Sequence, residues 1–202
     1  MNFNEHYKKV FNKVKSGLNG LIMIKNQLNY RAKLSIYHSL IHSHLSYCAL
    51  IWLNNIKIKQ RNMLKTIQKK AIRIIHGTKY NAHTNELFHK SKITKVENIF
   101  EKQSLILTYY YEQKKLPDSI LKLYDNSLHN NSILTRYLNK CSLKPKNELK
   151  NGHLMYEILN NWNNTNKSIR EEVNLRAFKR KIMELQNSFT KCVKVNCYSC
   201  NN

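Results

Sequence analysis

Five cations recur at every fourth residue over one stretch of the chain: Lys57, Arg61, Lys65, Lys69 and Arg73. On an α-helix this spacing forms a row that turns slowly around the axis. Apolar residues gather on roughly the opposite side, at Met63, Leu64, Ile67, Ala71, Ile74 and Ile75. If those residues are buried, all five cations point outward from one helix. We therefore expect the row to contact nucleic-acid phosphates without reading base edges.

A solvated charged face is the alternative explanation for this row. Such faces normally mix positive and negative charges, whereas residues 56–75 contain no acidic residue. The whole chain of 202 residues carries 35 Lys and Arg against 12 Asp and Glu, a net charge of +23. A polyanionic partner would neutralise that self-repulsion. A cationic membrane-surface protein competes with this interpretation, but the charge is spread over the whole chain instead of lying beside one lipid-facing anchor. We expect a nucleic-acid partner, no membrane and no small-molecule substrate.

Acidic residues are too few to suggest metal-assisted nucleotidyl transfer, which needs carboxylates converging on one point. The only aspartates are Asp118 and Asp125, and no paired-aspartate motif of the polymerase type occurs. Glu171 and Glu172 are adjacent, but they precede a predicted helix in a polar stretch typical of a solvated face. No glycine-rich elbow surrounds a serine or cysteine. We expect no catalysis by this chain alone and no cofactor.

Histidine and cysteine spacings suggest two metal sites, neither of which we assign. His38 and His42 share a helical face, but no acid follows at the spacing of a zinc protease. We expect the two histidines to be polar residues at the border of the packed face of a helix. The other candidate, Cys192, Cys197 and Cys200, resembles half of a zinc knuckle, and a tail with free thiols is the alternative. Because the amino terminus lacks the apolar core of a signal peptide, we expect an intracellular protein with reduced thiols.

Helical periodicity predicts the elements that position these residues. Helices are expected over about 5–28, 34–53, 56–75, 94–111 and 175–189, and a periodic stretch covers 153–159. The helix over 34–53 is apolar on most of its surface and should be the central one; its histidines and serines argue against a membrane span. Gly77 should end the basic helix and Asn174 should cap the last one. The fold class predicted is all-α, a multi-helix bundle with an irregular, partly helical C-terminal extension.

Several phrases, in this order along the chain, carry a family resemblance. They are SLIHSHLSY at 39–47, Trp52, QKKAIRII at 68–75 and HTNELF at 83–88. This order resembles the region just after the polymerase core in jockey-like, LINE-class non-LTR retrotransposon reverse transcriptases. The later pairs Thr135-Arg136, Trp162-Asn163, Ile169-Arg170 and Phe178-Lys179 are similar to the family's carboxyl-terminal pattern, with Thr165 and Asn166 in place of its Leu-Pro.

The chain becomes polar over 126–166, which predicts a polar linker or partial hairpin, and 167–202 should form a C-terminal helix with a cysteine-containing tail. The resemblance implies that residues 1–125 are a helical thumb-like domain that clamps the template-primer duplex. The catalytic fingers and palm would precede Met1, which makes the chain a non-catalytic fragment that binds RNA-DNA hybrid. A polymerase core would be a second partner, and nuclear residence follows from the family only.

Two other functions remain open at this stage. The chain could be an interaction module whose apolar faces, around Tyr7 to Leu28, dock a partner protein or a second copy. It could also be the remnant of a decayed element with no selected function.

Overall fold

The computed structural model describes residues 3–127 and 153–187. Within these ranges the regular elements are helices and there is no strand, which confirms the all-α prediction. The chain divides into two compact units, one of residues 1–100 with 185–202 and one of residues 101–184. The predicted boundaries at 125 and 166 stay a prediction, because most of the expected linker lies outside the described residues. No helix in the described ranges is long and apolar enough to cross a membrane.

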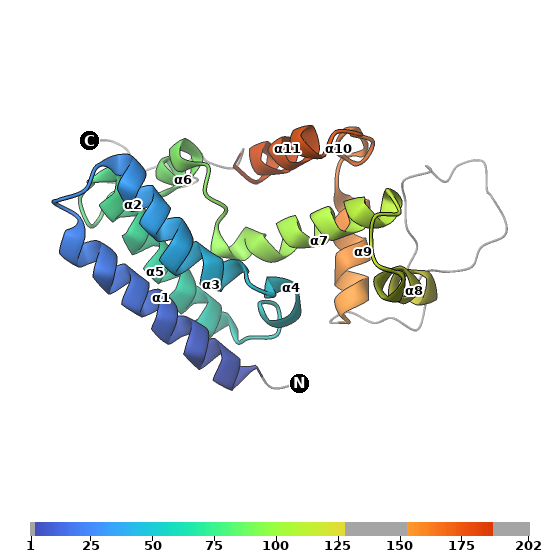
Figure 1. Cartoon of the computed structure of the whole chain (residues 1–202), viewed down its shortest axis with the longest axis horizontal. Coiled ribbons are helices and arrows are strands. Elements are labelled where there is room, and N and C mark those ends of the chain that lie inside the picture. The colour runs from blue at the N-terminus through green and yellow to red at the C-terminus, as the bar shows by residue number, and fades with distance from the viewer. Residues whose placement is uncertain (1–2, 128–152, 188–202) are drawn as a thin grey trace, which may run out of the picture. The chain divides into compact units, whose positions relative to one another are not determined.

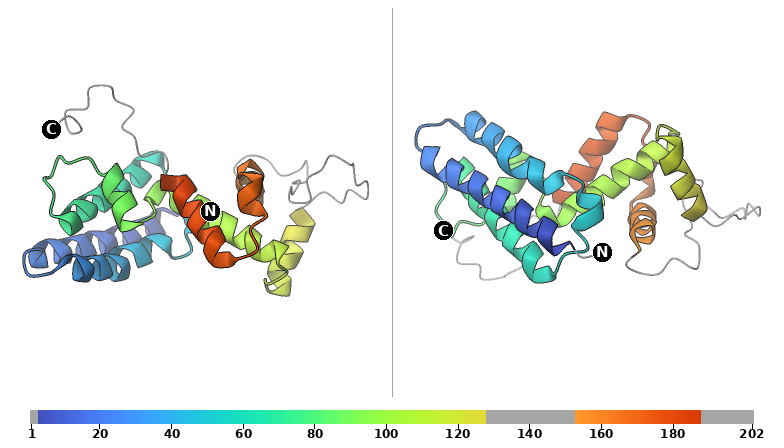
Figure 2. Two further views of the ribbon diagram at one scale, coloured as in Figure 1. Left: turned by 90° about the horizontal axis from the view of Figure 1, so that it is seen from above. Right: turned by 60° about the horizontal axis from the view of Figure 1, so that its bottom comes forward.

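The first unit is built on two long helices and a segmented third one (Figure 1). Its elements are α1 (Asn4–Ile24), α2 (Tyr30–Tyr37), the π-helix η1 (His38–His42), α3 (Ser43–Ser46), α4 (Ala49–Trp52), α5 (Ile58–His76), α6 (Asn85–Ser91) and the start of α7 (Val96–Glu112). Helix α1 packs against both α5 and η1, and the two views of Figure 2 show it beside each.

Close packing of α1 against η1 depends on Gly17. A Cβ atom added at Gly17 would lie 2.8 Å from the Leu40 carbonyl oxygen and 3.1 Å from Cγ1 of Ile41. Real Cβ atoms do not approach a backbone oxygen so closely, so only glycine allows this separation between the helices. Around it, Val14 and Leu21 are fully buried. The low helix propensity of glycine is offset here by tighter packing.

The expected continuous helix over 34–53 is wrong in its continuity. The chain forms α2, widens into the π turn η1, resumes as α3 and breaks at Cys48, whose φ of 48° is left-handed. The indole N–H of Trp52 donates to the Tyr47 carbonyl oxygen (2.9 Å), which supplies that oxygen with a partner at the break. Cys48 is exposed instead of lying in the buried row.

One face of this segment packs in the core, whereas Leu40, Tyr47 and Ile51 are exposed, so the prediction that it lies centrally among the other helices is not confirmed. Its buried row is Tyr37, Ile41, Leu45, Ala49 and Trp52, with Ala49 in place of Cys48. Tyr37, Ile41 and Leu45 are four residues apart, a step that drifts around an α-helix of 3.6 residues per turn, and the wider π turn offsets part of that drift. The π turn therefore helps to keep these three side chains on the face that packs in the core.

The second unit contains the rest of α7, then α8 (Asp118–Ser127), α9 (Leu154–Asn164), α10 (Lys167–Arg170) and most of α11 (Leu175–Asn187). Tyr109 of α7 stacks on Phe178 of α11 with ring centroids 4.5 Å apart, and Trp162 of α9 lies 6.1 Å from the same ring. Tyr111 and Tyr124 stack at 4.4 Å. Aromatic pairs thus form much of this core.

Two predictions about the carboxyl-terminal half can be compared with these helices. Helix α9 covers the periodic stretch at 153–159 and continues to Asn164, with Trp162 buried in the core of the second unit. Asn174 caps α11 as predicted: its Oδ1 accepts from the N–H groups of Arg176 (2.8 Å) and Ala177 (3.3 Å). The observed helix ends at Asn187, and the tail beyond it lies outside the described residues.

Candidate nucleic-acid interface

Helix α5 carries the basic row, and both of its ends are fixed by local hydrogen bonds. At its start Lys57 is extended (ψ 146°), and its N–H donates to the Gln60 side-chain oxygen (3.0 Å). At its end Gly77 adopts the left-handed conformation (φ 64°), and the Thr78 N–H donates to the Arg73 carbonyl (3.0 Å). The prediction that Gly77 ends this helix is confirmed.

The structure corrects the expectation that the five cations of the row all point freely outward. Lys57 is exposed and precedes the first turn of α5. Arg61 is half-buried, and its Nη2 donates to the Leu53 carbonyl (2.9 Å) just after α4. Arg73 donates from Nε to the Ala82 carbonyl (2.9 Å) in the loop before α6. The row drifts around the helix far enough for its two arginines to meet neighbouring loops.

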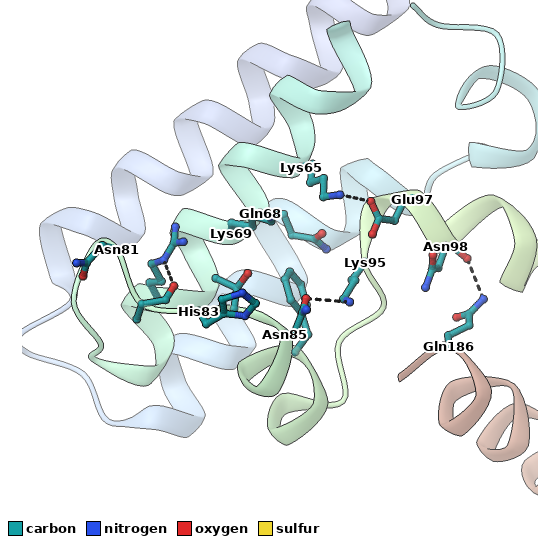
Figure 3. Close-up of a pocket in the computed structure, with 14 residues that line it drawn as sticks. Lys65, Gln68, Lys69, Asn81, His83, Asn85, Lys95, Glu97, Asn98 and Gln186 are labelled. Carbon is teal, nitrogen blue, oxygen red and sulfur yellow. Dashed lines mark hydrogen bonds and ion pairs between the residues drawn. The ribbon is translucent and has the colours of Figure 1, made fainter. Parts of the chain in front are cut away.

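The two remaining cations of the row face the segment that leads into α7. Lys65 forms an ion pair with Glu97, and both side chains are partly exposed (Figure 3). Lys69 lies one turn further along α5 and is half-buried. The apolar side of α5 is largely as predicted, with Leu64, Ile67, Ala71 and Ile75 buried. Met63, which was expected on that side, is 42% exposed.

Gln68, which is fully buried beside Lys69, fixes the distance between α5 and the start of α7. Its Nε2 donates to the Tyr37 hydroxyl (2.8 Å) and to the Thr94 carbonyl (2.9 Å), and its Oε1 accepts from the Val96 N–H (2.9 Å). One amide therefore joins three segments through three bonds. Burial raises the pKa of the Tyr37 phenol, so this hydroxyl stays protonated.

A pocket of about 560 Å³ lies between α5, the loop before α6 and the start of α7. Its cations are Lys65, Lys69, Arg73 and Lys95, and Glu97 is its one carboxylate, which gives a net charge of +3 when His83 is neutral. Polar side chains complete much of the remaining lining, including Gln68, Asn81, His83, Thr84, Asn85 and Asn98. Figure 3 shows these side chains arranged around the pocket.

The electrostatics of the pocket favour an anion. Partial burial lowers the pKa of Lys69. Repulsion from Lys65 and the other neighbouring cations lowers this pKa further, and Glu97 acts in the opposite direction. Burial and Lys65 also lower the pKa of Lys95, again against Glu97. Burial is the main cause of both lowered pKa values. The excess of four cations over one carboxylate leaves a net positive charge that a bound phosphate would compensate.

Lys95 is the principal residue of this site that the sequence pattern missed. It lies outside the basic helix, and its Nζ donates to Asn85 Oδ1 (3.2 Å) and lies 5.9 Å from the centroid of the Phe88 ring. The phrase HTNELF carries the family resemblance, and four of its residues also line the pocket: His83, Thr84, Asn85 and Phe88. That phrase was the available signal that this segment belongs with α5.

The pocket is not lined by His38, His42, Asp118 or Asp125. Among residues 3–127 and 153–187, no group of three or more His, Cys, Asp or Glu side chains could hold a metal ion. His38 and His42 lie side by side with ring centroids 5.4 Å apart. Cys192, Cys197 and Cys200 fall outside the described residues. Asp118 and Asp125 lie on α8, where Asp125 accepts a hydrogen bond from the Tyr111 hydroxyl (2.8 Å).

Comparisons of this chain with protein-family models, with curated proteins and with solved structures found no match. The resemblance to non-LTR reverse transcriptases therefore stays a prediction.

Proposed function

We propose that this chain binds the sugar-phosphate backbone of a nucleic acid at the basic pocket between α5 and the start of α7. The observation that carries the proposal is the gathering of four cations against one carboxylate on a concave surface. Glu97 pairs with Lys65 and also raises the pKa of Lys69 and Lys95, yet it is a single carboxylate among four cations. A phosphate group fits the charge and the hydrogen-bonding capacity of such a site.

The chemistry of the pocket supports backbone binding over recognition of base sequence. Lysine acts as a flexible point charge, and the guanidinium of Arg73 already uses Nε on a backbone carbonyl. Contacts of this kind position a nucleic acid but do not discriminate between base pairs. The overall charge of +23 would add a long-range attraction.

The proposed ligand is an RNA-DNA hybrid, and this choice depends on the family resemblance. In the proposed role the first unit clamps a template-primer duplex, as the thumb of a non-LTR reverse transcriptase would, without catalysing polymerisation itself. A polymerase core would then be its protein partner, and the nucleus its place of action.

Fluorescence polarisation with labelled RNA-DNA hybrids of unrelated sequences, titrated over a range of salt concentrations, tests the proposal. The informative variant is Lys69→Gln with Lys95→Gln, because Arg61 and Arg73 also hold loops in place and their replacement would confuse folding with binding. We expect similar affinity for each hybrid sequence. The double variant should bind more weakly and reduce the slope of log K against log salt by about two.

A control variant with the same loss of charge is Lys9→Gln with Lys13→Gln, two exposed lysines of α1. If the control weakens binding as much as the pocket variant, the effect is one of total charge and the pocket is not the site. A hybrid that binds equally well to the pocket variant would also refute the proposal.

A further inference from the structure

A second concave surface of the first unit has the opposite chemistry to the basic pocket. It is a groove of about 360 Å³ between α1 and α5, lined mainly by the apolar side chains of Phe11, Leu18, Ile22, Met63 and Ile67. We name it the α1–α5 groove. Its position and its apolar lining make it separate from the site of the proposed function.

Helices α1 and α5 run parallel along this groove. The Gln60 amide donates to Asn4 Oδ1 (3.2 Å), and one turn later the Tyr7 hydroxyl donates to the Met63 sulfur (3.5 Å). Both pairs are 56 residues apart in sequence, so the two helices advance together. The apolar lining residues are separated by seven and four positions on α1 and by four on α5, which forms two short apolar ridges side by side. A third helix can pack between such ridges.

The groove is open along part of its length in the described structure. Ile22 is 41% exposed and Met63 is 42% exposed, whereas Leu18 and Ile67 beneath them are buried. Single exposed apolar residues are ordinary on protein surfaces. Here two of them lie on the two sides of one groove whose floor is already apolar, which is the arrangement of a docking site for an apolar side-chain row.

The charges at the groove favour an acidic occupant. Lys15 on α1 and Lys70 on α5 are exposed among the lining residues, and the lining contains no acidic residue. A second copy of the chain would bring another +23 of charge and would be repelled. Nucleic acid carries the right charge but cannot fill an apolar groove.

We propose that the α1–α5 groove docks an amphipathic helix of a partner protein, with apolar side chains in the groove and carboxylates facing Lys15 and Lys70. This is the helix-in-groove mode of recognition, in which residues at positions i, i+3, i+4 and i+7 act as anchors.

The test uses two synthetic helical peptides with the same row of leucines, one with glutamates and one with lysines on the flanks of that row. Binding is followed by polarisation and by the methyl resonances of the full chain labelled with ¹³C-methyl methionine. We expect the glutamate peptide to bind and to shift the resonance of Met63, while that of Met155, which is buried in the second unit, stays in place.

Two variants separate the apolar and charged contributions. Ile22→Gln with Met63→Gln should weaken the glutamate peptide about tenfold or more, since two anchoring contacts are lost. Lys15→Glu with Lys70→Glu should reverse the preference in favour of the lysine peptide. Thermal unfolding of each variant shows whether it remains folded, and Lys69→Gln with Lys95→Gln should leave peptide binding unchanged.

Several results would overturn this proposal. Equal binding of the two peptides would show that the lysines select nothing. A Met63 resonance that shifts on dilution of the free protein would show that a second copy occupies the groove. A resonance that moves on removal of residues 188–202 would show that a segment of the chain itself occupies it.

Discussion

Replacing Gln68 by leucine should destabilise the first unit far more than its conservative size suggests. The substitution removes three hydrogen bonds, to the Tyr37 hydroxyl, the Thr94 carbonyl and the Val96 N–H. At a net value of about 1 kcal/mol for each bond, the free energy of unfolding should fall by about 3 kcal/mol. Tyr37 and Val96 are fully buried, so water cannot easily replace the lost partner.

A second substitution, Tyr37→Phe, should change the free energy of unfolding differently with and without Gln68. Tyr37→Phe in the native background removes one bond and should cost about 1 kcal/mol. In the Gln68→Leu background the same change removes a buried hydroxyl that has lost its amide partner, so it should be neutral or stabilising. The coupling between the two sites should therefore be about 1 to 2 kcal/mol.

Urea unfolding followed by tryptophan fluorescence measures these values for the first unit alone. The chain has two tryptophans, Trp52 in the first unit and Trp162 in the second, both buried. With Trp162→Phe as the common background, the signal reports on Trp52 only. The reasoning is wrong if Gln68→Leu costs less than about 1 kcal/mol, or if Tyr37→Phe has the same effect in both backgrounds.

Two further predictions concern packing and pH. Gly17→Ala should lower the free energy of unfolding by about 1 to 3 kcal/mol, because its new Cβ meets the Leu40 carbonyl. Gly20→Ala has nothing within 4 Å of its new Cβ and should raise the free energy of unfolding by up to about 1 kcal/mol. Urea unfolding compares the two variants. Phosphate bound in the basic pocket should raise the lowered pKa values of Lys69 and Lys95, so affinity for hybrid should begin to fall below the ordinary lysine pKa of 10.5 as the pH rises. Polarisation titrations at constant ionic strength check this fall, and affinity that stays constant until ordinary lysines lose their protons would contradict it.

The helices were predictable where a single physical signal dominated. The 3.6-residue period located α1, α5 and α11, the left-handed preference of glycine placed the end of α5 at Gly77, and the side chain of Asn174 marked the start of α11. The breaks within the segment over 34–53 were not predictable from periodicity. The apolar row continues across Tyr47 and Cys48, and the break is stabilised by a bond from the Trp52 indole that depends on the folded arrangement.

The candidate site was predictable in its charge but not in its shape. The spacing of the basic row identified α5, and Lys65 and Lys69 do line the pocket. Lys95 was missed because it reaches the pocket from another segment, and Gln68 was missed because a glutamine within a basic stretch resembles a solvated residue. Its role follows from contacts with residues 31, 26 and 28 positions away in sequence, which no local pattern reveals.

The hydrogen bonds of Arg61 and Arg73 to backbone carbonyls limit which substitutions α5 can accept. At these two positions a planar guanidinium reaches a loop, and lysine would keep the charge but change the geometry. At Lys57 and Lys69 charge is the main requirement, so arginine and lysine should interchange there. Among descendants of this sequence, the basic row should therefore show two fixed arginines among freely exchanging cations, a pattern set by the loops and not by the ligand.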